Sequence, residues 1–380
     1  MSSLLKKISK LFRNRKKNAR NNKGADSENS EELNDDQNLQ NSSVNNDCLS
    51  LDNQFEILTE RLERDNRTLG SGSFSCVKRG TLQIDNNEGN DMRVAIKSAR
   101  NKFDPYIIRA FHEEIKLLAS LAPHPNVLTF IGFVRMRVPE IVTELVESGD
   151  LFDLNIREKT DQFNNTEMST DQRSLCTFDL VSYVYQITNG MEYLASVPCN
   201  HRDLALHNVF VSQDNTIRIG DFALAGRHSN NENYKCRMAN DQLIPIWWTA
   251  PEVMDECESS EKTDIFAFGV CLFELFSLGD CKQNSDPLER ILPFPEPEFC
   301  PPEIYQFMLK CWNNDPALRP TFTDCFTFFG EFLDRHNRQL RQQIYGKLQA
   351  VSEWQKDIRN QVHGRDLVHP EIDVPVINSE

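Results

Sequence analysis

From about residue 62 the chain changes from polar sequence to short β-like segments, and this change restricts the fold more than any other feature. Four such segments surround one amphipathic stretch, and mostly helical sequence follows them: RTLGSGSFSCVKRG, MRVAIKSA, NVLTFIGFV and PEIVTEL. Strands gathered in one part of a chain and helices in another indicate an α+β protein. The pattern predicts a small lobe with a sheet and one helix, and a larger lobe of helices.

Two helices can be predicted in some detail. Asp104 and Pro105 are typical of an N-cap and a first helical residue, and an apolar stripe follows them until Pro123 and Pro125 end it. The segment DLVSYVYQITNGMEYLAS has helical periodicity and predicts a long helix of the larger lobe. A polar insertion at residues 157–174 comes before it.

Charge is distributed unevenly along the chain. The net charge is −15, yet residues 1–23 carry nine lysines and arginines and no acidic residue. Apolar and basic residues fall on opposite faces of a helix over residues 1–20, which is typical of a segment that associates with an anionic membrane surface. A solvated basic tail or a nuclear-import patch would explain the same pattern. Residues 24–61 are polar and acidic, and predict a disordered linker.

The C-terminal part predicts one more helix, over residues 334–365, followed by a disordered tail at 366–380. Its apolar residues recur at helical spacing: Leu340, Ile344, Leu348, Val351 and Ile358. Such a stripe indicates a helix that either docks on the domain or pairs with another chain. It is too short to define a coiled coil.

Composition narrows the class of protein. No segment approaches the roughly 18 consecutive apolar residues that a membrane-spanning helix needs, and the N-terminus lacks the apolar region of a secretory signal. The eleven cysteines include no C-x-x-C pair, which favours reduced thiols over disulfides or a zinc site. We therefore expect a cytoplasmic globular protein, located at the inner face of the plasma membrane if residues 1–20 bind anionic lipid, and we expect no nucleic-acid partner.

Several residues meet the needs of phosphoryl transfer, which requires positioned phosphates, a cation and a group that orients the attacking hydroxyl. GSGSF at 70–74 places two glycines where backbone amides can approach phosphates, although a glycine-rich hairpin is a simpler explanation. Lys97 ends an apolar strand, and Glu114 on the predicted helix can partner its charge. A solvated edge lysine would explain that position as well. In CNHRDLALHNVFV, Asp203 is a candidate proton acceptor and Asn208 follows it.

The order and spacing of a larger set of residues resemble the signature of protein kinases. The set consists of Gly70, Gly72, Lys97, Glu114, His201-Arg202-Asp203, Asn208, Asp221-Phe222, Ala250-Pro251-Glu252, Asp264 and Arg319. The resemblance covers residues 62–333. It implies a bilobal protein kinase fold, with a small β-rich N-lobe that carries one regulatory helix and a larger α-helical C-lobe.

The resemblance implies that the catalytic residues are Asp203, Lys97, Glu114, Arg202 and Asn208, and that the metal ligands are Asn208 and Asp221. Lys97 would hold the α- and β-phosphates of ATP while it is paired with Glu114. Asp203 would accept or orient the hydroxyl proton. Asn208 and Asp221 would bind Mg²⁺.

The resemblance also assigns residues to nucleotide binding and to structural support. Thr143 would be the gatekeeper at the back of the adenine pocket, and residues 144–146 would form the hinge, whose backbone meets the adenine edge. The residues expected at ATP are Leu69, Gly70, Gly72, Val77, Ala95, Lys97, Thr143, Glu144 and Val146. Glu252 would bridge to Arg319, and Asp264 would brace the catalytic loop.

The acceptor is expected to be a tyrosine hydroxyl. Serine/threonine kinases usually carry a lysine two residues after the catalytic aspartate, where this chain has Ala205. PIWWTAPE at 245–252 resembles the Pro-[Ile/Val]-[Lys/Arg]-Trp-x-Ala-Pro-Glu segment of tyrosine kinases. The long helix and the insertion before it resemble split-kinase receptors of the fibroblast growth factor receptor group, here without their extracellular and transmembrane parts. We therefore expect a non-receptor protein-tyrosine kinase that acts on protein substrates.

Four substitutions depart from the family pattern. Ser75 replaces the third glycine of the phosphate loop, and His207 replaces an arginine that helps to place the acceptor. Phe210 replaces a smaller residue below the adenine, and Ala223 replaces the glycine after Asp-Phe, which restricts the backbone there. None of them removes a phosphate, metal or proton ligand. A pseudokinase scaffold that binds nucleotide remains the alternative, and serine/threonine specificity is a third interpretation.

A regulatory site is expected at Tyr234, in the polar segment between Asp221 and Glu252 that has the character of an activation loop. A phosphate there would carry about −1.5 to −2 charges and could pair with Arg202, beside the catalytic aspartate, and so order the loop. An ordinary exposed tyrosine is the simpler alternative.

Overall fold

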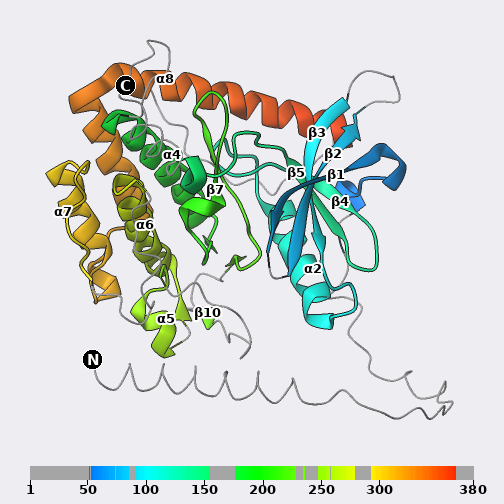
Figure 1. Ribbon diagram of the computed structural model, residues 1–380, viewed down its shortest axis with the longest axis horizontal. Helices are drawn as coiled ribbons and strands as arrows, with labels where there is room; N and C mark the ends of the chain where they lie inside the picture. The colour runs from blue at the N-terminus through cyan, green and yellow to red at the C-terminus, as the bar shows by residue number, and fades with distance from the viewer. Residues whose placement is uncertain are drawn as a thin grey trace, which may run out of the picture. The chain divides into compact units, whose positions relative to one another are not determined.

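The computed structural model describes residues 51, 53–72, 74–84, 91–154, 176–227, 234–235, 247–256, 258–278 and 292–364. A sheet-containing lobe comes first in the chain and a lobe of helices follows (Figure 1). The bilobal α+β fold predicted from the sequence is confirmed. The basic segment 1–23, the insertion 157–174 and the tail 366–380 lie outside the described residues.

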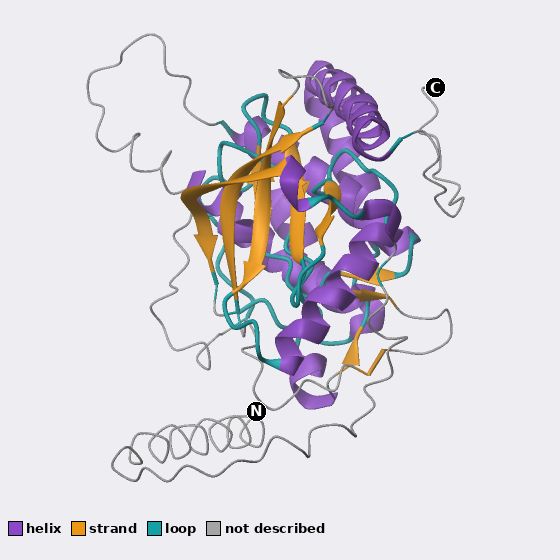
Figure 2. Cartoon of the chain, turned by 90° about the vertical axis from the view of Figure 1, so that its right-hand side faces the viewer, coloured by secondary structure: helices purple, strands orange, loops and turns teal. Residues whose placement is uncertain are grey.

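The N-lobe is built on a five-stranded antiparallel sheet. Its strands are β1 (Leu62–Ser71), β2 (Ser75–Gln83), β3 (Asp91–Ala99), β4 (Phe130–Val134) and β5 (Glu140–Glu144). Their order is β1-β2-β3-β5-β4, and they lie side by side in Figure 2. Helix α2 (Pro105–Ser120) begins as predicted, because the Asp104 side chain accepts a hydrogen bond from the Tyr106 backbone N–H.

Both faces of this sheet are covered. Side chains alternate between the faces along a regular strand, but the register of β4 shifts between Phe130 and Gly132. Phe130 and Phe133 therefore both join the core that includes α2. Ile131 and Val134 instead join a second cluster, which contains residues near the end of α8 (Phe322–His363). Helix α2 therefore covers one face, and the last turns of α8 cover the other.

The C-lobe contains further helices. They are α4 (Thr177–Ser196), α5 (Pro251–Glu256), α6 (Glu261–Phe276) and α7 (Pro302–Cys311). Two-stranded pairs connect them: β6 (Cys199–Asn200) with β9 (Gly226–Arg227), β7 (Val209–Val211) with β8 (Ile217–Ile219), and β10 (Tyr234–Lys235) with β11 (Glu258–Ser259). Short 3-10 helices span Asn53–Phe55, Thr59–Arg61, Leu206–Asn208 and Pro316–Leu318.

The disordered linker was predicted to extend to residue 61, and this boundary was wrong. Leu51, Phe55 and Ile57 are buried against the N-lobe. The Ile57 N–H donates to the Phe133 carbonyl over 2.8 Å. Burial of three apolar side chains stabilises a segment whose average composition is polar. The folded part therefore begins before β1.

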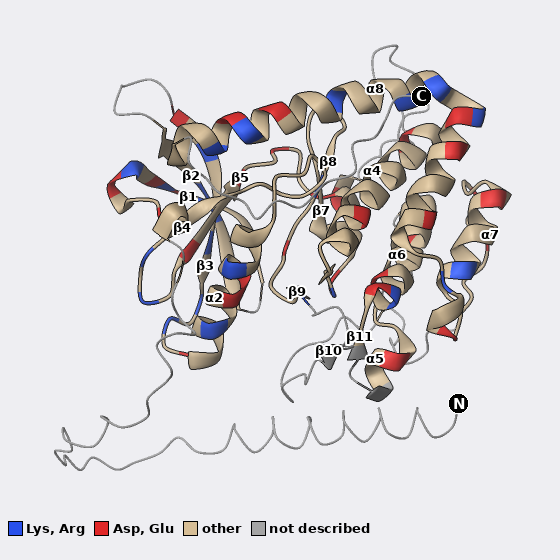
Figure 3. Cartoon of the chain, turned by 180° about the vertical axis from the view of Figure 1, so that it is seen from behind, with Lys and Arg blue, Asp and Glu red and all other residues tan. Residues whose placement is uncertain are grey.

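The C-terminal helix was predicted over residues 334–365, and α8 is considerably longer. It begins after Thr321, whose side chain accepts from the Asp324 N–H, and its helical geometry breaks once, at Asn337 (φ −158°, ψ 66°). The predicted helix corresponds to residues 334–363 of α8, which is the larger, C-terminal part of it. Of the two arrangements left open by the sequence, the structure shows docking on the domain. Charged residues recur along the length of the helix (Figure 3).

Candidate active site

An ion cluster joins β3, α2 and the segment after β8. Lys97 Nζ lies 2.7 and 3.0 Å from the two carboxylate oxygens of Glu114, and 2.9 Å from Asp221 Oδ1. Burial disfavours the charged ammonium, but the two carboxylates outweigh this effect and raise the pKa of Lys97. Burial raises the pKa of Glu114, although the lysine partly opposes it. The structure therefore brings one cation and two carboxylates together, with Lys97 and Glu114 largely buried and Asp221 partly exposed.

Asp203 lies in the loop between β6 and the following 3-10 helix. Burial, reinforced by the negative charge of Asp221, raises the pKa of Asp203 to about 7. Asn208 donates from Nδ2 to the Asp203 carbonyl oxygen over 2.7 Å. A base whose pKa lies near neutrality is well suited to accept a proton under physiological conditions.

Asp264, at the start of α6, holds the backbone of this loop. Its two carboxylate oxygens accept hydrogen bonds from the backbone N–H groups of His201 (2.7 Å) and Arg202 (2.8 Å). Arg202 has a left-handed conformation with φ 66°, which is costly for a residue with a β-carbon. Two bonds to a buried carboxylate offset that cost. Burial nevertheless raises the pKa of Asp264 to about 6.

A second left-handed residue is Asp221, with φ 57°. Ala223, where the family has glycine, does not have a positive φ, and its N–H lies 3.4 Å from Asp221 Oδ1. The left-handed backbone conformation in this segment is therefore adopted by Asp221, not by Ala223. Burial opposes ionisation of Asp221, but the charge of Lys97 outweighs it and lowers the pKa of Asp221.

The glycine-rich segment forms the turn between the first two strands. Leu69 and Gly70 lie on β1, and Leu69 is exposed. Gly72 follows the strand, and its N–H donates to the Ser75 carbonyl over 2.9 Å. The serine in place of the third glycine is thus the first residue of β2 and helps to close the turn.

The strand register places four expected nucleotide-site residues on one face of the sheet. Val77 lies opposite Lys97, and Ala95 lies opposite Thr143. Opposed residues of antiparallel strands share a face, as do residues two apart on one strand. The lysine that binds Glu114 therefore stands in the same row as the predicted gatekeeper. Val146 follows β5.

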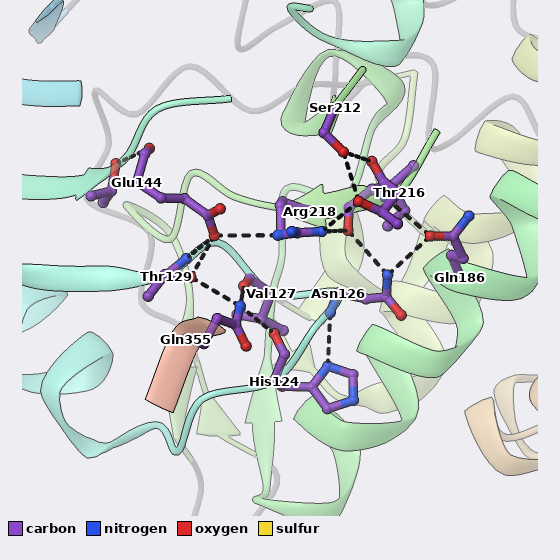
Figure 4. A network of polar contacts seen from close by, with 12 residues as sticks. His124, Asn126, Val127, Thr129, Glu144, Gln186, Ser212, Thr216, Arg218 and Gln355 are labelled. Atoms are coloured by element: carbon purple, nitrogen blue, oxygen red, sulfur yellow. Dashed lines mark hydrogen bonds and ion pairs between the residues drawn. The ribbon is translucent and has the colours of Figure 1, made fainter. Parts of the chain in front are cut away.

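Glu144 ends β5, and its side chain belongs to a buried polar network (Figure 4). Its Oε1 accepts from the Thr129 N–H (2.8 Å), from Thr129 Oγ1 (2.5 Å) and from Arg218 Nε (3.3 Å). The carboxylate is therefore occupied, and any contact with a nucleotide would come from the backbone. Sequence reasoning missed Arg218, although a charge between two isoleucines in IRI signals that a buried partner is needed.

The ring of Trp248 contacts His207, one of the four positions that depart from the family pattern. The rings of His207 and Trp248 meet edge to face, with centroids 5.5 Å apart. Trp248 Nε1 donates to Glu274 Oε2 over 3.0 Å, and burial raises the pKa of that carboxyl to about 7. His207 is exposed, and so it forms part of the surface that an acceptor side chain would meet.

The backbone of the expected regulatory tyrosine lies near Arg202. Residue Tyr234 pairs with Ser259 in the β10–β11 ladder, and Arg202 Nε donates to Ser259 Oγ over 2.8 Å. Arg202 also contacts the Leu224 carbonyl over 3.4 Å. The Tyr234 side chain lies outside the described part of the structure, so its role stays a prediction.

Arg319 and Glu252 form a two-bond ion pair. Nη1 and Nη2 of Arg319 lie 2.6 and 2.9 Å from the carboxylate oxygens of Glu252. The guanidinium also donates to the carbonyls of Lys262 and Asn313, each over 2.8 Å. All three nitrogens of this buried guanidinium therefore donate hydrogen bonds, and these bonds tie α5 to the segment before α8.

The oxygen donors of the site fit a magnesium nucleotide. Among the residues that the structure describes, no three His, Cys, Asp or Glu side chains are placed to hold a metal ion by themselves. Mg²⁺ is usually bound by one or two protein oxygens together with substrate phosphates. Asp221 offers a carboxylate, and Asn208 offers its amide oxygen because the amide nitrogen is bonded to Asp203. Lys97 supplies a cation for the phosphates.

Comparison with known proteins gives a consistent result. Residues 64–329 match the family described as protein tyrosine and serine/threonine kinase. The chain is 35% identical over 354 residues to the receptor-like tyrosine-protein kinase kin-15 of Caenorhabditis elegans, which covers 82% of the chain and 72% of that protein. It is 29% identical over 305 residues to fibroblast growth factor receptor 1 of Dugesia japonica, a match that covers 77% of the chain and 34% of the receptor. It is 33% identical over 264 residues to the tyrosine-protein kinase Fer of Mus musculus, a match that covers 67% of the chain and 29% of Fer.

The two lobes and the ion cluster between them define the protein kinase class. The chain belongs to the protein tyrosine and serine/threonine kinase family, and these relatives are tyrosine kinases. The resemblance to tyrosine kinases found in the sequence is thus confirmed. The chain spans only 34% of the planarian receptor and 29% of Fer. Within the described residues, no helix has the length and apolar character to cross a membrane.

Proposed function

We propose that the protein is a catalytically active, non-receptor protein-tyrosine kinase of the cytoplasm, which transfers the γ-phosphate of ATP to tyrosine hydroxyls of protein substrates. The observation that carries this proposal is the contact of Lys97 with both Glu114 and Asp221. It joins the N-lobe helix to the magnesium-binding segment, as phosphoryl transfer requires. The cysteines of the described residues are free thiols, which suits a reducing compartment.

Each residue of the cluster has a distinct task in this reaction. Lys97 holds the nucleotide phosphates, and Asp221 and Asn208 hold Mg²⁺, which neutralises charge on the phosphates when it is bound. Asp203 orients the attacking hydroxyl and takes its proton. A bond forms between the tyrosine oxygen and the γ-phosphorus, the bond to the bridging oxygen breaks, and ADP leaves.

Three observations support tyrosine as the acceptor. Ala205 stands where a serine/threonine kinase usually carries lysine. The ring pair of His207 and Trp248 offers an aromatic surface beside Asp203, and aromatic rings pack favourably in edge-to-face pairs. The relatives named above are described as tyrosine kinases.

A nucleotide-binding scaffold without phosphotransfer is the second candidate. It is favoured by Phe210, whose ring fills space next to the segment that carries Asp221. A β-carbon on Gly220 would lie only 2.7 Å from that ring. A bulky ring there would shift the bound nucleotide into an unproductive position. The catalytic ligands themselves are all present, and this is why we favour the active kinase.

One experiment separates the two candidates. Purified protein is incubated with Mg²⁺ and γ-labelled ATP on mixed tyrosine and serine/threonine peptides, and phosphoamino acids are then analysed. Asp203→Asn should keep nucleotide binding and lose phosphotransfer, because it removes the proton acceptor and leaves Lys97 in place. Equal labelling by wild type and variant, both above background, would indicate a contaminating kinase and support the scaffold.

A further inference from the structure

Helix α8 contributes to both hydrophobic clusters of the residues that the structure describes. Ile344 and Leu348, in its second half, are buried in the large core. Ile358 and Val362, about three turns further on, are buried against the outer face of the N-lobe sheet. The helix runs along both lobes in Figure 1. Its position is thereby fixed at two ends by apolar packing.

Between these two anchors, α8 points one fully buried amide at the segment that connects α2 to β4. Gln355 is 0% exposed. Its Nε2 lies 3.1 Å from the His124 carbonyl, 3.4 Å from the Val127 carbonyl and 2.9 Å from Thr129 Oγ1. The next turn adds Arg359, which donates to the Leu121 carbonyl over 3.3 Å. The whole α2–β4 connection is thus held by the C-terminal helix.

The contact with Thr129 continues to the hinge (Figure 4). Because Nε2 donates to Thr129 Oγ1, the hydroxyl proton of this residue is left to point at Glu144 Oε1. Two backbone N–H groups donate across the same contact: the Thr129 N–H donates to the side-chain oxygen Glu144 Oε1 over 2.8 Å, and the Glu144 N–H donates to the Thr129 carbonyl over 3.0 Å. The Thr129 hydroxyl therefore links the side-chain amide of Gln355 on α8 to the carboxylate of Glu144, the first hinge residue.

We propose that Gln355 is a positioning residue for the nucleotide site, which acts from the C-terminal helix through Thr129 on the hinge at Glu144. The inference rests on the proposed function insofar as it concerns ATP. It assigns α8 a part in nucleotide affinity as well as in stability. The reason is chemical: a buried carboxylate keeps a fixed place only while its donors are oriented, and Gln355 orients one of them.

The substitution that tests this can be made selective. Gln355 Oε1 has no hydrogen-bond partner within the described part of the chain. Gln355→Met has a similar shape and therefore removes only the Nε2 donor. Gln349→Met makes the same change on the same helix at an exposed glutamine, which bonds to Tyr345 and not to the hinge. At the relay, Thr129→Val breaks the hydroxyl link and Thr129→Ser keeps it.

The first measurement does not need nucleotide. Hydrogen–deuterium exchange of the backbone amides of Thr129 and Glu144 reports directly on the two bonds that close the hinge contact. In Gln355→Met both amides should exchange roughly three- to tenfold faster, since a bond to a charged network has been loosened. In Gln349→Met they should exchange as in wild type. Unchanged exchange in Gln355→Met would overturn the proposal.

The second measurement is the dependence of the rate on ATP concentration, in the full-length protein and well below its melting temperature. Gln355→Met and Thr129→Val should each raise the KM for ATP roughly three- to tenfold and change kcat less than about twofold. Thr129→Ser should retain the wild-type KM. The double variant should match Thr129→Val alone, because both changes break one relay.

These two measurements distinguish failure of the Gln355 inference from failure of the proposed kinase function. If wild type neither binds nor uses ATP, the kinase proposal fails and amide exchange alone decides the role of Gln355. If Gln355→Met loses stability while the KM for ATP stays at the wild-type value, α8 is only a structural support and the inference is wrong. The same conclusion follows if Gln349→Met raises the KM equally.

Discussion

Replacement of Lys97 by methionine tests the energetics of the ion cluster. The ammonium lies within 3.0 Å of both Glu114 and Asp221, and the Lys97 and Glu114 side chains are only 14% and 5% exposed. Removing one partner of a buried ion pair costs about 3–5 kcal/mol. A typical domain is stable by about 5–15 kcal/mol, so Lys97→Met should fold but should be clearly weakened.

The cost of this substitution should depend on pH, and the sign can be worked out. Burial already raises the pKa of Glu114 above its unfolded value of 4.5, and loss of the lysine would raise it further. The folded protein then retains a proton that the unfolded chain has released. The loss of stability is therefore absent below the unfolded pKa and grows as the pH rises toward the folded pKa.

Urea denaturation followed by tryptophan fluorescence, at about pH 5 and about pH 8, measures this effect. Lys97→Met should lose more free energy of unfolding at the higher pH, and adding Glu114→Gln should restore most of the loss. Lys116→Met, on an exposed pair of the same helix, should cost at most about 1 kcal/mol. Equal losses at the two pH values, or no recovery in the double variant, would refute the reasoning.

Three more predictions concern activity, regulation and location. Phosphotransfer should decline as the pH falls below about 7, because burial and Asp221 raise the pKa of Asp203 to about 7 and the base must be deprotonated; a flat pH–rate profile between about 6 and 8 would exclude this aspartate as the base. Tyr234→Phe should lower the activity of ATP-treated protein severalfold without unfolding it, and an unmodified Tyr234 in mass spectra of a fully active enzyme would show that the loop is no switch. Residues 1–20 fused to a reporter should bind anionic vesicles less as salt increases, since each basic residue contributes roughly 1 kcal/mol; absence of binding at low salt would favour a solvated tail or a nuclear-import patch.

Local chemistry made part of this fold predictable. The start of α2 follows from Asp104 and Pro105, because an N-cap and a first-turn proline act within a few residues of each other. The contact between Lys97 and Glu114 was expected for a similar reason: a charge at the end of an apolar strand needs a partner, and the nearby helix offered one.

The remaining features depend on parts of the chain that are distant in sequence. Phe55 is buried because β4 and the end of α8 lie over it, and its own polar neighbours give no sign of this. Gln355 bonds to Thr129 across 226 positions of the chain. Helical periodicity identifies which face of α8 is apolar, but it carries no information about the surface that receives that face. The path from α8 to the hinge could therefore not be predicted from the sequence.

The cover that α8 places on the outer sheet face also has a consequence for synthesis of the protein. The strands that form this face end with β5 at Glu144, whereas Ile358 and Val362 lie near the end of the last described segment and are made much later. At about 5–20 residues per second, a ribosome would need roughly 10–40 s to travel between them. During that interval Ile96, Val142 and their neighbours present an uncovered apolar surface on a nascent chain. Messages that end before this point should therefore yield N-lobes that depend on chaperones or aggregate.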